Sequence, residues 1–269
     1  MKINNDQTEH SIRSNAPAGG SLRRIRLLVA YDGTDYCGFQ WQNNGPTIED
    51  VLKTALEDLL KEPVRLISAS RTDAGVHSLG NVVVFDTASR IPADRFAYAI
   101  NRGLPPDIAI QASDEVPLTW HPRKQVSKKT YEYRILNRKM PDPTKRRDHY
   151  FYHYPLDETR MKQAAEYLAG THDFASFVSA GSTAETTVRT IHSIDVFRKG
   201  EIITIRVCGN GFLYNMIRII AGTLILIGSG QMEPEQMQTI LSAKDRSSAG
   251  PTAPACGLTM IGITYEKEN

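Results

Sequence analysis

The sequence predicts an α+β fold of two ferredoxin-like β-α-β-β-α-β units, which form a mainly antiparallel central sheet with helices on one side. Segments with the two-residue period of strands alternate with segments whose apolar residues share one helical stripe. This β-α-β-β-α-β order occurs twice along the chain, which is typical of a split βαβ arrangement. With 269 residues, 41% of them hydrophobic, the chain can bury the core of such a fold.

The first unit is expected over residues 23–125. Its opening strand, 24–31, has an apolar residue at every second position, as expected for a strand with a buried face. A helix should begin after Thr47, because an apolar stripe follows and Thr47 with Asp50 resembles a capping box. Pro63 ends this helix. The remaining elements of the unit are expected to be strands over 64–69, 81–87 and 107–111, and a helix between Pro92 and Gly103.

The second unit is expected over residues 126–269. A strand over 129–136 has aromatic residues on one face, and Asp157 should cap a helix that ends before Gly170. The elements that follow are a hairpin of strands over 191–197 and 202–207, an apolar helix over 212–227, a short helix from Pro234 and a last strand over 258–265. Residues 1–22 are polar without an apolar period and are expected to form a disordered extension.

The loop between two strands of the first unit, Ser70–Gly80, is longer than a hairpin connection needs to be. It reads Ser-Arg-Thr-Asp-Ala-Gly-Val-His-Ser-Leu-Gly, so a carboxylate at Asp73 lies close to Arg71 and His77. Asp73 taken alone fits a simple turn, with Gly75 in a positive φ conformation two positions later. A functional role for Asp73 is the alternative, and the rest of the chain favours it. His77 is expected only to order the loop.

Positive charge is concentrated in one segment. Between His121 and Tyr154 there are ten Lys or Arg and three acids, a local charge of +7 in a chain whose net charge is +2. Tyrosine, phenylalanine and histidine residues are interleaved with these charges. Cations beside aromatic faces suit phosphate neutralisation and base stacking, so a polyanionic partner is favoured over a merely solvated charged face. The RNA-contacting candidates are Lys128, Lys129, Lys145, Arg146 and Arg147.

Cysteine use and hydropathy indicate a compartment. The three cysteines are far apart and odd in number, so neither a disulfide framework nor a C-x-x-C zinc site is indicated. We therefore expect a cytoplasmic protein without membrane association. The most apolar segment, 212–227, is too short and too polar to span a membrane, and its Arg218 would be buried in a packed helix. Arg218 either extends to solvent or pairs with a carboxylate, for which Asp73 is the candidate.

Five separated blocks resemble the TruA-type tRNA pseudouridine synthases in that family's order, together with the Asp73 loop itself. They are Tyr31–Gln40 (YDGTDYCGFQ), Asn101–Ile108 (NRGLPPDI), Lys128–Arg134 (KKTYEYR), Phe212–Arg218 (FLYNMIR) and Ala253–Leu258 (APACGL). The Asp73 loop departs from the usual family form at Ser70, Ser78 and Asn81. The resemblance covers almost the whole chain and implies the pseudouridine synthase fold.

The resemblance also implies residue roles and partners. Asp73 is expected to be the catalytic residue, Tyr131 to contact the target base and Arg218 to pair with Asp73. The expected substrate is tRNA, at uridines 38–40 on the 3′ side of the anticodon arm, and the expected assembly is a homodimer. No cofactor and no metal are expected, because the isomerisation changes no oxidation state. By periodicity alone, Tyr131 would instead be an ordinary core-facing strand aromatic.

The chemistry explains these residue types. Uridine becomes pseudouridine when the bond from ribose to the base nitrogen breaks and the base is rejoined through carbon, which requires a carboxylate acting as nucleophile or as base. An adjacent Arg218 should favour the ionised form of Asp73. Arg71 could fill the gap left by an extruded nucleotide, or it could be a phosphate contact or a plain surface residue. The alternatives in other classes are a non-catalytic structured-RNA-binding protein and an Asp-dependent glycoside hydrolase.

Overall fold

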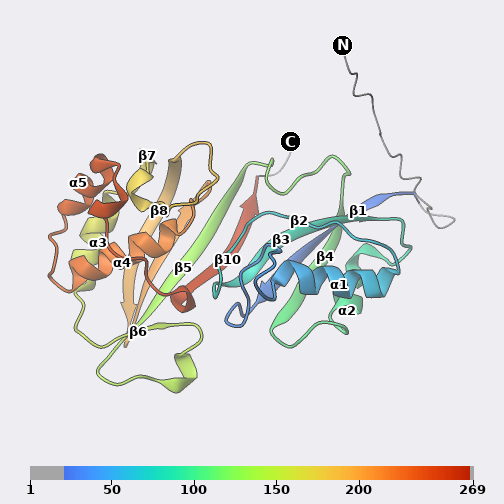
Figure 1. Cartoon of the computed structure of the whole chain (residues 1–269), viewed down its shortest axis with the longest axis horizontal. Helices are drawn as coiled ribbons and strands as arrows, with labels where there is room; N and C mark the ends of the chain where they lie inside the picture. The colour runs from blue at the N-terminus through green and yellow to red at the C-terminus, as the bar shows by residue number, and fades with distance from the viewer. Residues whose placement is uncertain (1–20, 267–269) are drawn as a thin grey trace, which may run out of the picture.

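The computed structural model describes residues 21–266, and Figure 1 shows them as one long curved sheet with helices packed against it. The first half contains β1 (Arg23–Tyr31), α1 (Ile48–Leu60), β2 (Ile67–Ser68), β3 (His77–Thr87), α2 (Phe96–Ile100) and β4 (Ile108–Val116). The second half contains β5 (Ser127–Asn137), β6 (Tyr150–Tyr152), α3 (Glu158–Glu166), β7 (Gly170–Asp173), β8 (Val188–Lys199), β9 (Ile202–Gly209), α4 (Met216–Gly228), α5 (Gln236–Ala243) and β10 (Leu258–Tyr265).

The strand order confirms the predicted fold class. The sheet runs β4-β1-β3-β10-β5-β9-β8-β7, and β2 pairs with β3 outside this path. Each half therefore contains the ferredoxin-like order, as β4-β1-β3-β2 and as β10-β5-β9-β8. The halves meet where β3 and β10 run parallel, with His77 opposite Thr259 and Ser78 opposite Met260. Every other pairing among these strands is antiparallel, except that of β5 with β6.

The helices cover one face of the sheet in two groups. On β1, Ile25, Leu27 and Val29 are fully buried, and they form one core with residues of α1 and α2. On β5, alternate residues beginning with Tyr131 form the other core with α3, α4 and α5. Figure 1 shows these groups as the blue and green helices over the first half and the orange and yellow helices over the second. Because successive side chains of a strand point to opposite faces, the alternate apolar residues all lie on the face that the helices cover.

Two predicted helix caps are confirmed. Thr47 precedes α1 in extended conformation, and its side chain accepts a hydrogen bond from the Asp50 backbone N–H at 3.3 Å. Asp157 precedes α3 and accepts from the N–H groups of Thr159 and Arg160. Both side chains satisfy N–H groups that have no partner within the helix.

Several predicted boundaries are wrong for identifiable reasons. The Asp73 loop is shorter than 70–80, because β3 already begins at His77 and its first residues pair with β10. The strand expected over 64–69 is only the two-residue β2, which pairs with Val83 and Val84 of β3. The apolar helix begins at Met216 rather than 212, because Asn215 adopts a left-handed conformation with φ 60°. The sequence did not predict β6 and β7.

The expected N-terminal extension, 1–22, lies outside the described residues except for its last two positions. Ser21 and Leu22 precede β1 without regular structure, and Leu22 is exposed. Within 21–266, the helices are all too short or too polar to cross a bilayer.

Candidate active site

Asp73 lies in the connection between β2 and β3, at the centre of the sheet. The backbone turns there through a hydrogen bond from Val76 N–H to the Asp73 carbonyl (3.2 Å), and Gly75 has φ 76°. The turn with a positive φ that the sequence suggested is therefore present. The Asp73 carboxylate, whose side chain is 22% exposed, nevertheless contacts a residue from the other half of the chain.

That residue is Arg218, whose Nη1 lies 3.6 Å from Asp73 Oδ2. Two hydrogen bonds orient the guanidinium: Nε donates to the Ala253 carbonyl and Nη1 to Asn215 Oδ1, both at 2.8 Å. Because α4 begins at Met216, Arg218 lies in its first turn rather than in mid-helix. A cation is unfavourable at a helix N-terminus, so a neighbouring carboxylate offsets this cost.

Burial dominates the protonation of Asp73. It raises the pKa of the carboxyl group above its ordinary value, and the charge of Arg218 opposes this rise only in part. As the sequence suggested, Arg218 by itself lowers the pKa of Asp73 and so favours the ionised form. The effect of burial is larger, so the pKa of Asp73 is raised overall. A carboxylate kept from water in this way is poorly solvated, which makes it a stronger base than an exposed one.

Tyr131 lies next to this pair, on β5. Its ring packs edge-to-face on Phe212 with centroids 5.4 Å apart, and its side chain is buried. Burial raises the pKa of Tyr131 to about 12, and the negative charge of Asp73 adds to the effect. Tyr131 is thus both the core-facing strand aromatic that periodicity predicts and a neighbour of Asp73, with which it lines one cavity.

Asp73, Tyr131 and Phe212 line a cavity of about 630 Å³ between the 69–76 loop and the segment before α4. Among its described lining residues Asp73 is the one carboxylate, and the charged residues around it are cations. The cations that line it are Arg71, Arg123, Lys129 and Arg189. A smaller neighbouring hollow of about 430 Å³ shares the last three of these cations and Phe212. The arrangement suits a polyanion whose reacting part enters beside Asp73.

The cavity cations differ in how freely they can reach a ligand. Arg71 is exposed, and the structure gives its side chain no ionic partner within 21–266. Lys129 donates to the Ala69 carbonyl at 2.8 Å, and its burial lowers the pKa of the amine to about 8, with the charges of Arg123 and Arg189 contributing. Arg189, which the sequence analysis did not single out, reaches the cavity from β8.

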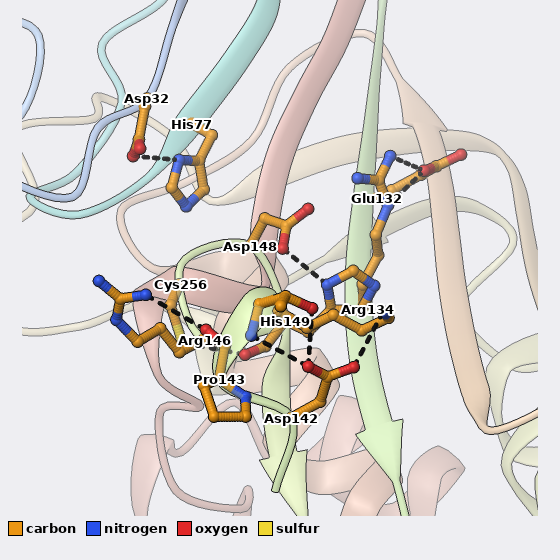
Figure 2. A network of polar contacts seen from close by, with 12 residues as sticks. Asp32, His77, Glu132, Arg134, Asp142, Pro143, Arg146, Asp148, His149 and Cys256 are labelled. Atoms are coloured by element: carbon orange, nitrogen blue, oxygen red, sulfur yellow. Dashed lines mark hydrogen bonds and ion pairs between the residues drawn. The ribbon is translucent and has the colours of Figure 1, made fainter. Parts of the chain in front are cut away.

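The other predicted RNA-contacting residues are not brought into this cavity. Lys128 is exposed on β5, whereas the segment 138–149, which connects β5 to β6, lines a different hollow of about 470 Å³. Within this segment Lys145 pairs with Asp142 at 3.1 Å. Arg146 donates to the Pro143 carbonyl at 3.2 Å, and Figure 2 labels both of these residues. Arg147 pairs with Asp32 of the first half at 3.0 Å. Local charge density alone could not separate these cations from those around Asp73.

Comparison with known proteins decides the family. The family model described as tRNA pseudouridine synthase matches residues 27–123 and 164–266. The chain belongs to the tRNA pseudouridine synthase family, a family of isomerases. The matched residues include Asp73 in their first part and Arg218 in their second, whereas Tyr131 falls between the two.

Curated relatives support this assignment. A protein named tRNA pseudouridine synthase A from Acetivibrio thermocellus is 45% identical over 91% of this chain and 100% of its own length. One of the same name from a Thermoanaerobacter species is 44% identical over the same shares, and tRNA pseudouridine synthase A 2 from Clostridium tetani is 47% identical over 90% of this chain and 99% of its own. The high coverage shows that the similarity extends over both halves of the chain.

A solved archaeal box H/ACA sRNP Nop10–Cbf5 complex aligns with 88% of this chain at 12% identity. The TM-score is 0.32, and the chain spans less than half, 46%, of that structure's chain. Such a score is too low to support any inference about the site.

Within residues 21–266, no three His, Cys, Asp or Glu side chains gather in a way that could hold a metal ion.

Proposed function

We propose that this protein converts uridine to pseudouridine at positions 38–40 of the tRNA anticodon arm, with Asp73 as the catalytic residue. The observation that carries the proposal is the cavity in which one partly buried carboxylate lies among cations and beside Arg218. Membership of the family supports the reaction, and the tRNA substrate is that of the relatives' names.

In this reaction Asp73 acts at ribose C1′, where the bond to uracil N1 breaks. Asp73 is either the nucleophile at the sugar or the base that initiates bond cleavage. The freed uracil turns within the cavity, its C5 bonds to C1′, the C5 proton leaves to solvent, and N1 takes up a proton from solvent. Tyr131 and Phe212, which pack edge-to-face on each other, would form the aromatic wall of the cavity against which the base turns. Asn215 and Ala253 keep Arg218 aimed at Asp73 throughout.

The target nucleotide must leave its stack to reach a carboxylate at the bottom of a cavity. Arg71 stands two residues before Asp73 at the exposed rim, where its side chain can occupy the vacated space in the anticodon arm. Arg123, Lys129 and Arg189 extend from the cavity into the neighbouring hollow, so they provide a path for the phosphates that flank the target. Lys128 continues this path along β5.

We further propose that the protein acts in the cytoplasm as a homodimer. An anticodon arm is longer than one cavity, so a second copy provides a surface for the remainder of the tRNA. Residues 23–125 would then act as the half that carries the catalytic aspartate, and residues 126–269 as the half that carries Tyr131 and Arg218.

Two alternative functions, glycoside hydrolysis and RNA binding without catalysis, can be distinguished from this one by experiment. A glycoside hydrolase generally uses a second carboxylate as acid and base, and the described lining of the cavity offers Asp73 alone. A protein that only binds structured RNA would not require a buried carboxylate, which repels phosphates, at the centre of its basic surface.

The experiment uses tRNA tritiated at uracil C5, from which formation of the new carbon bond releases label to water. We expect release by the native protein and none by Asp73→Asn, which should still bind the tRNA. Asp195→Asn is the matched control, since Asp195 pairs with Lys162 on the exposed surface and should release label normally. Normal release of tritium by Asp73→Asn would refute the catalytic assignment. Release of free, still labelled uracil from the tRNA would indicate a glycosidase.

A further inference from the structure

The loop after β1 holds the catalytic loop in place. We call residues 32–39 the clasp loop; it lies along the turn that carries Asp73 and is bonded to it through the backbone. The contacts are hydrogen bonds from Phe39 N–H to the Thr72 carbonyl (3.0 Å), from Gly75 N–H to the Tyr36 carbonyl (3.3 Å) and from Gly33 N–H to His77 Nδ1 (3.1 Å). Asp73 is therefore bracketed on both sides by residues that the clasp loop fixes.

Close approach of the two backbones makes this contact tight. A Cβ atom added at Gly38 would lie 2.7 Å from the Thr72 carbonyl oxygen, and one added at Gly33 would lie 2.0 Å from the Val76 carbonyl oxygen. Only glycine allows the loops to meet at these distances. A displacement of the clasp loop is therefore transmitted to the residues on either side of Asp73.

Arg147, from the second half of the chain, holds the clasp loop. Its Nη1 lies 3.0 Å from Asp32 Oδ2, and its Nη2 lies 3.5 Å from Asp35 Oδ2. Asp32 Oδ1 in turn lies 3.1 Å from His77 Nδ1, a contact drawn in Figure 2, and it accepts a hydrogen bond from Thr34 N–H. Burial alone would raise the pKa of Asp32, but the hydrogen bonds from Thr34 and Arg147 outweigh burial and lower it. The carboxylate that receives Arg147 is thus ionised.

Two arginines of the second half form ion pairs with the first half. Among the described residues, the ion pairs that join residues before 126 to residues after 126 are Arg218 with Asp73, and Arg147 with Asp32 and Asp35. One acts on the catalytic carboxylate directly, and the other acts on the loop that holds it. We propose that Arg147 is a positioning residue, which fixes Asp73 relative to Arg218 by holding the clasp loop.

This inference rests on the proposed function of Asp73, and it replaces the predicted role of Arg147 as a phosphate ligand. A guanidinium between two carboxylates belongs to a group with a net negative charge, which repels phosphate. Asp107 and Asp148 line the same hollow and outnumber its one further cationic Lys or Arg side chain, Arg134. Arg147 is therefore better suited to holding two loops together than to binding RNA.

The test compares variants at saturating tRNA in single-turnover tritium release. Arg147→Ala should lower the rate about ten- to a hundredfold, the range expected for a misplacement of roughly 1 Å, while the Kd for tRNA changes less than twofold. Arg138→Ala is the matched control, because it removes a guanidinium from the same segment whose partner, Glu201, belongs to the second half. Its rate should stay within twofold of native.

Two further variants separate positioning from general destabilisation. Arg147→Lys should recover part of the rate, because an ammonium can still reach one of the two carboxylates. Asp32→Asn should lose rate as Arg147→Ala does, and the double variant should be no slower than the slower single one, since both break the same link. Additive losses would indicate independent effects and would overturn the inference.

A phosphate ligand would behave differently. If Arg147→Ala reacts at the native rate when saturated, but binds tRNA more weakly with a flatter salt dependence, Arg147 contacts RNA and the positioning role is wrong. Failure of the proposed function has a separate signature, which is tritium release by Asp73→Asn. The two hypotheses therefore fail in different variants.

Discussion

The contact between Gly38 and Thr72 offers a direct test of how catalysis depends on the clasp loop. Gly38 has φ 99°, and an added Cβ atom would lie 2.7 Å from the Thr72 carbonyl oxygen, next to Asp73 in the chain. The substitution Gly38→Ala therefore adds strain to the backbone and a collision with the catalytic loop. Thr72 cannot move away cheaply, because its Oγ1 is bonded to the Tyr31 hydroxyl at 2.8 Å.

The magnitude follows from these distances. Ordinary van der Waals contact for a Cβ atom begins at 3.4 Å, so the two backbones must separate by about 0.7 Å. The positive φ costs about 1–3 kcal/mol and the overpacking about 1–3 kcal/mol more. In a domain of this size each kcal/mol lowers Tm by about 2–4 °C, so we expect a fall of roughly 4–24 °C. A displacement of this size beside the reacting carboxylate should slow turnover about a hundredfold.

The matched control is Gly200→Ala. Gly200 also has a positive φ, 61°, but no atom lies within 4 Å of its added Cβ, and it is in the hairpin turn between β8 and β9. It should lose some stability and keep the native rate of tritium release at saturating tRNA. If Gly38→Ala, measured well below its Tm, reacts as fast as Gly200→Ala, the clasp loop does not position Asp73.

Two pH dependences follow from the site. Burial raises the pKa of Asp73, and the proposed reaction uses its ionised form. The single-turnover rate should therefore fall on acidification already at a pH above 3.9, which is about the ordinary pKa of an Asp side chain. A rate that stays constant down to pH 4 would contradict this. Lys129, whose pKa is about 8, is charged below that pH and neutral above it, so tRNA affinity should weaken as pH rises from 7 to 9. Filter binding should show this change in the native protein and not in Lys129→Arg; equal pH dependence in both would exclude Lys129 as its source.

The sequence predicted the order of elements because periodicity and capping are local signals. The α1 and α3 caps appear where Thr47 and Asp157 indicated them. The short β7 reads Gly-Thr-His-Asp and has no apolar alternation, so only its pairing with β8 makes it a strand. The start of β3 could not be located either, since His77 and Ser78 become strand residues by pairing with a segment at the far end of the chain.

The site was predictable where chemistry and sequence pattern coincide. The contact of Asp73 with Arg218 is present, as the buried charge in an apolar segment suggested. The ion pairs of Arg147 were not predictable, because it follows two cations in a basic segment and its acidic partners lie more than a hundred residues earlier. The contact between Asn81 Nδ2 and the Ser70 carbonyl at 3.1 Å is a second example: two positions that depart from the usual family form are bonded to each other across the base of the catalytic loop.

The junction between the two halves explains why charged contacts are used there. The strands β3 and β10 pair over two positions only, whereas β5 and β9 pair from Lys129 to Leu136. A ladder this short resists rotation of one half against the other only weakly, yet the proposed reaction requires a carboxylate from the first half and a guanidinium from the second to stay about 3.6 Å apart. On the face away from the helices, Tyr265 of β10 packs on Trp120 and donates to the Pro122 carbonyl, which braces one end of the junction. Arg147 pairs with Asp32 at the end near the clasp loop. If these contacts hold the two halves in place, as we propose, loss of either should lower turnover before it lowers stability.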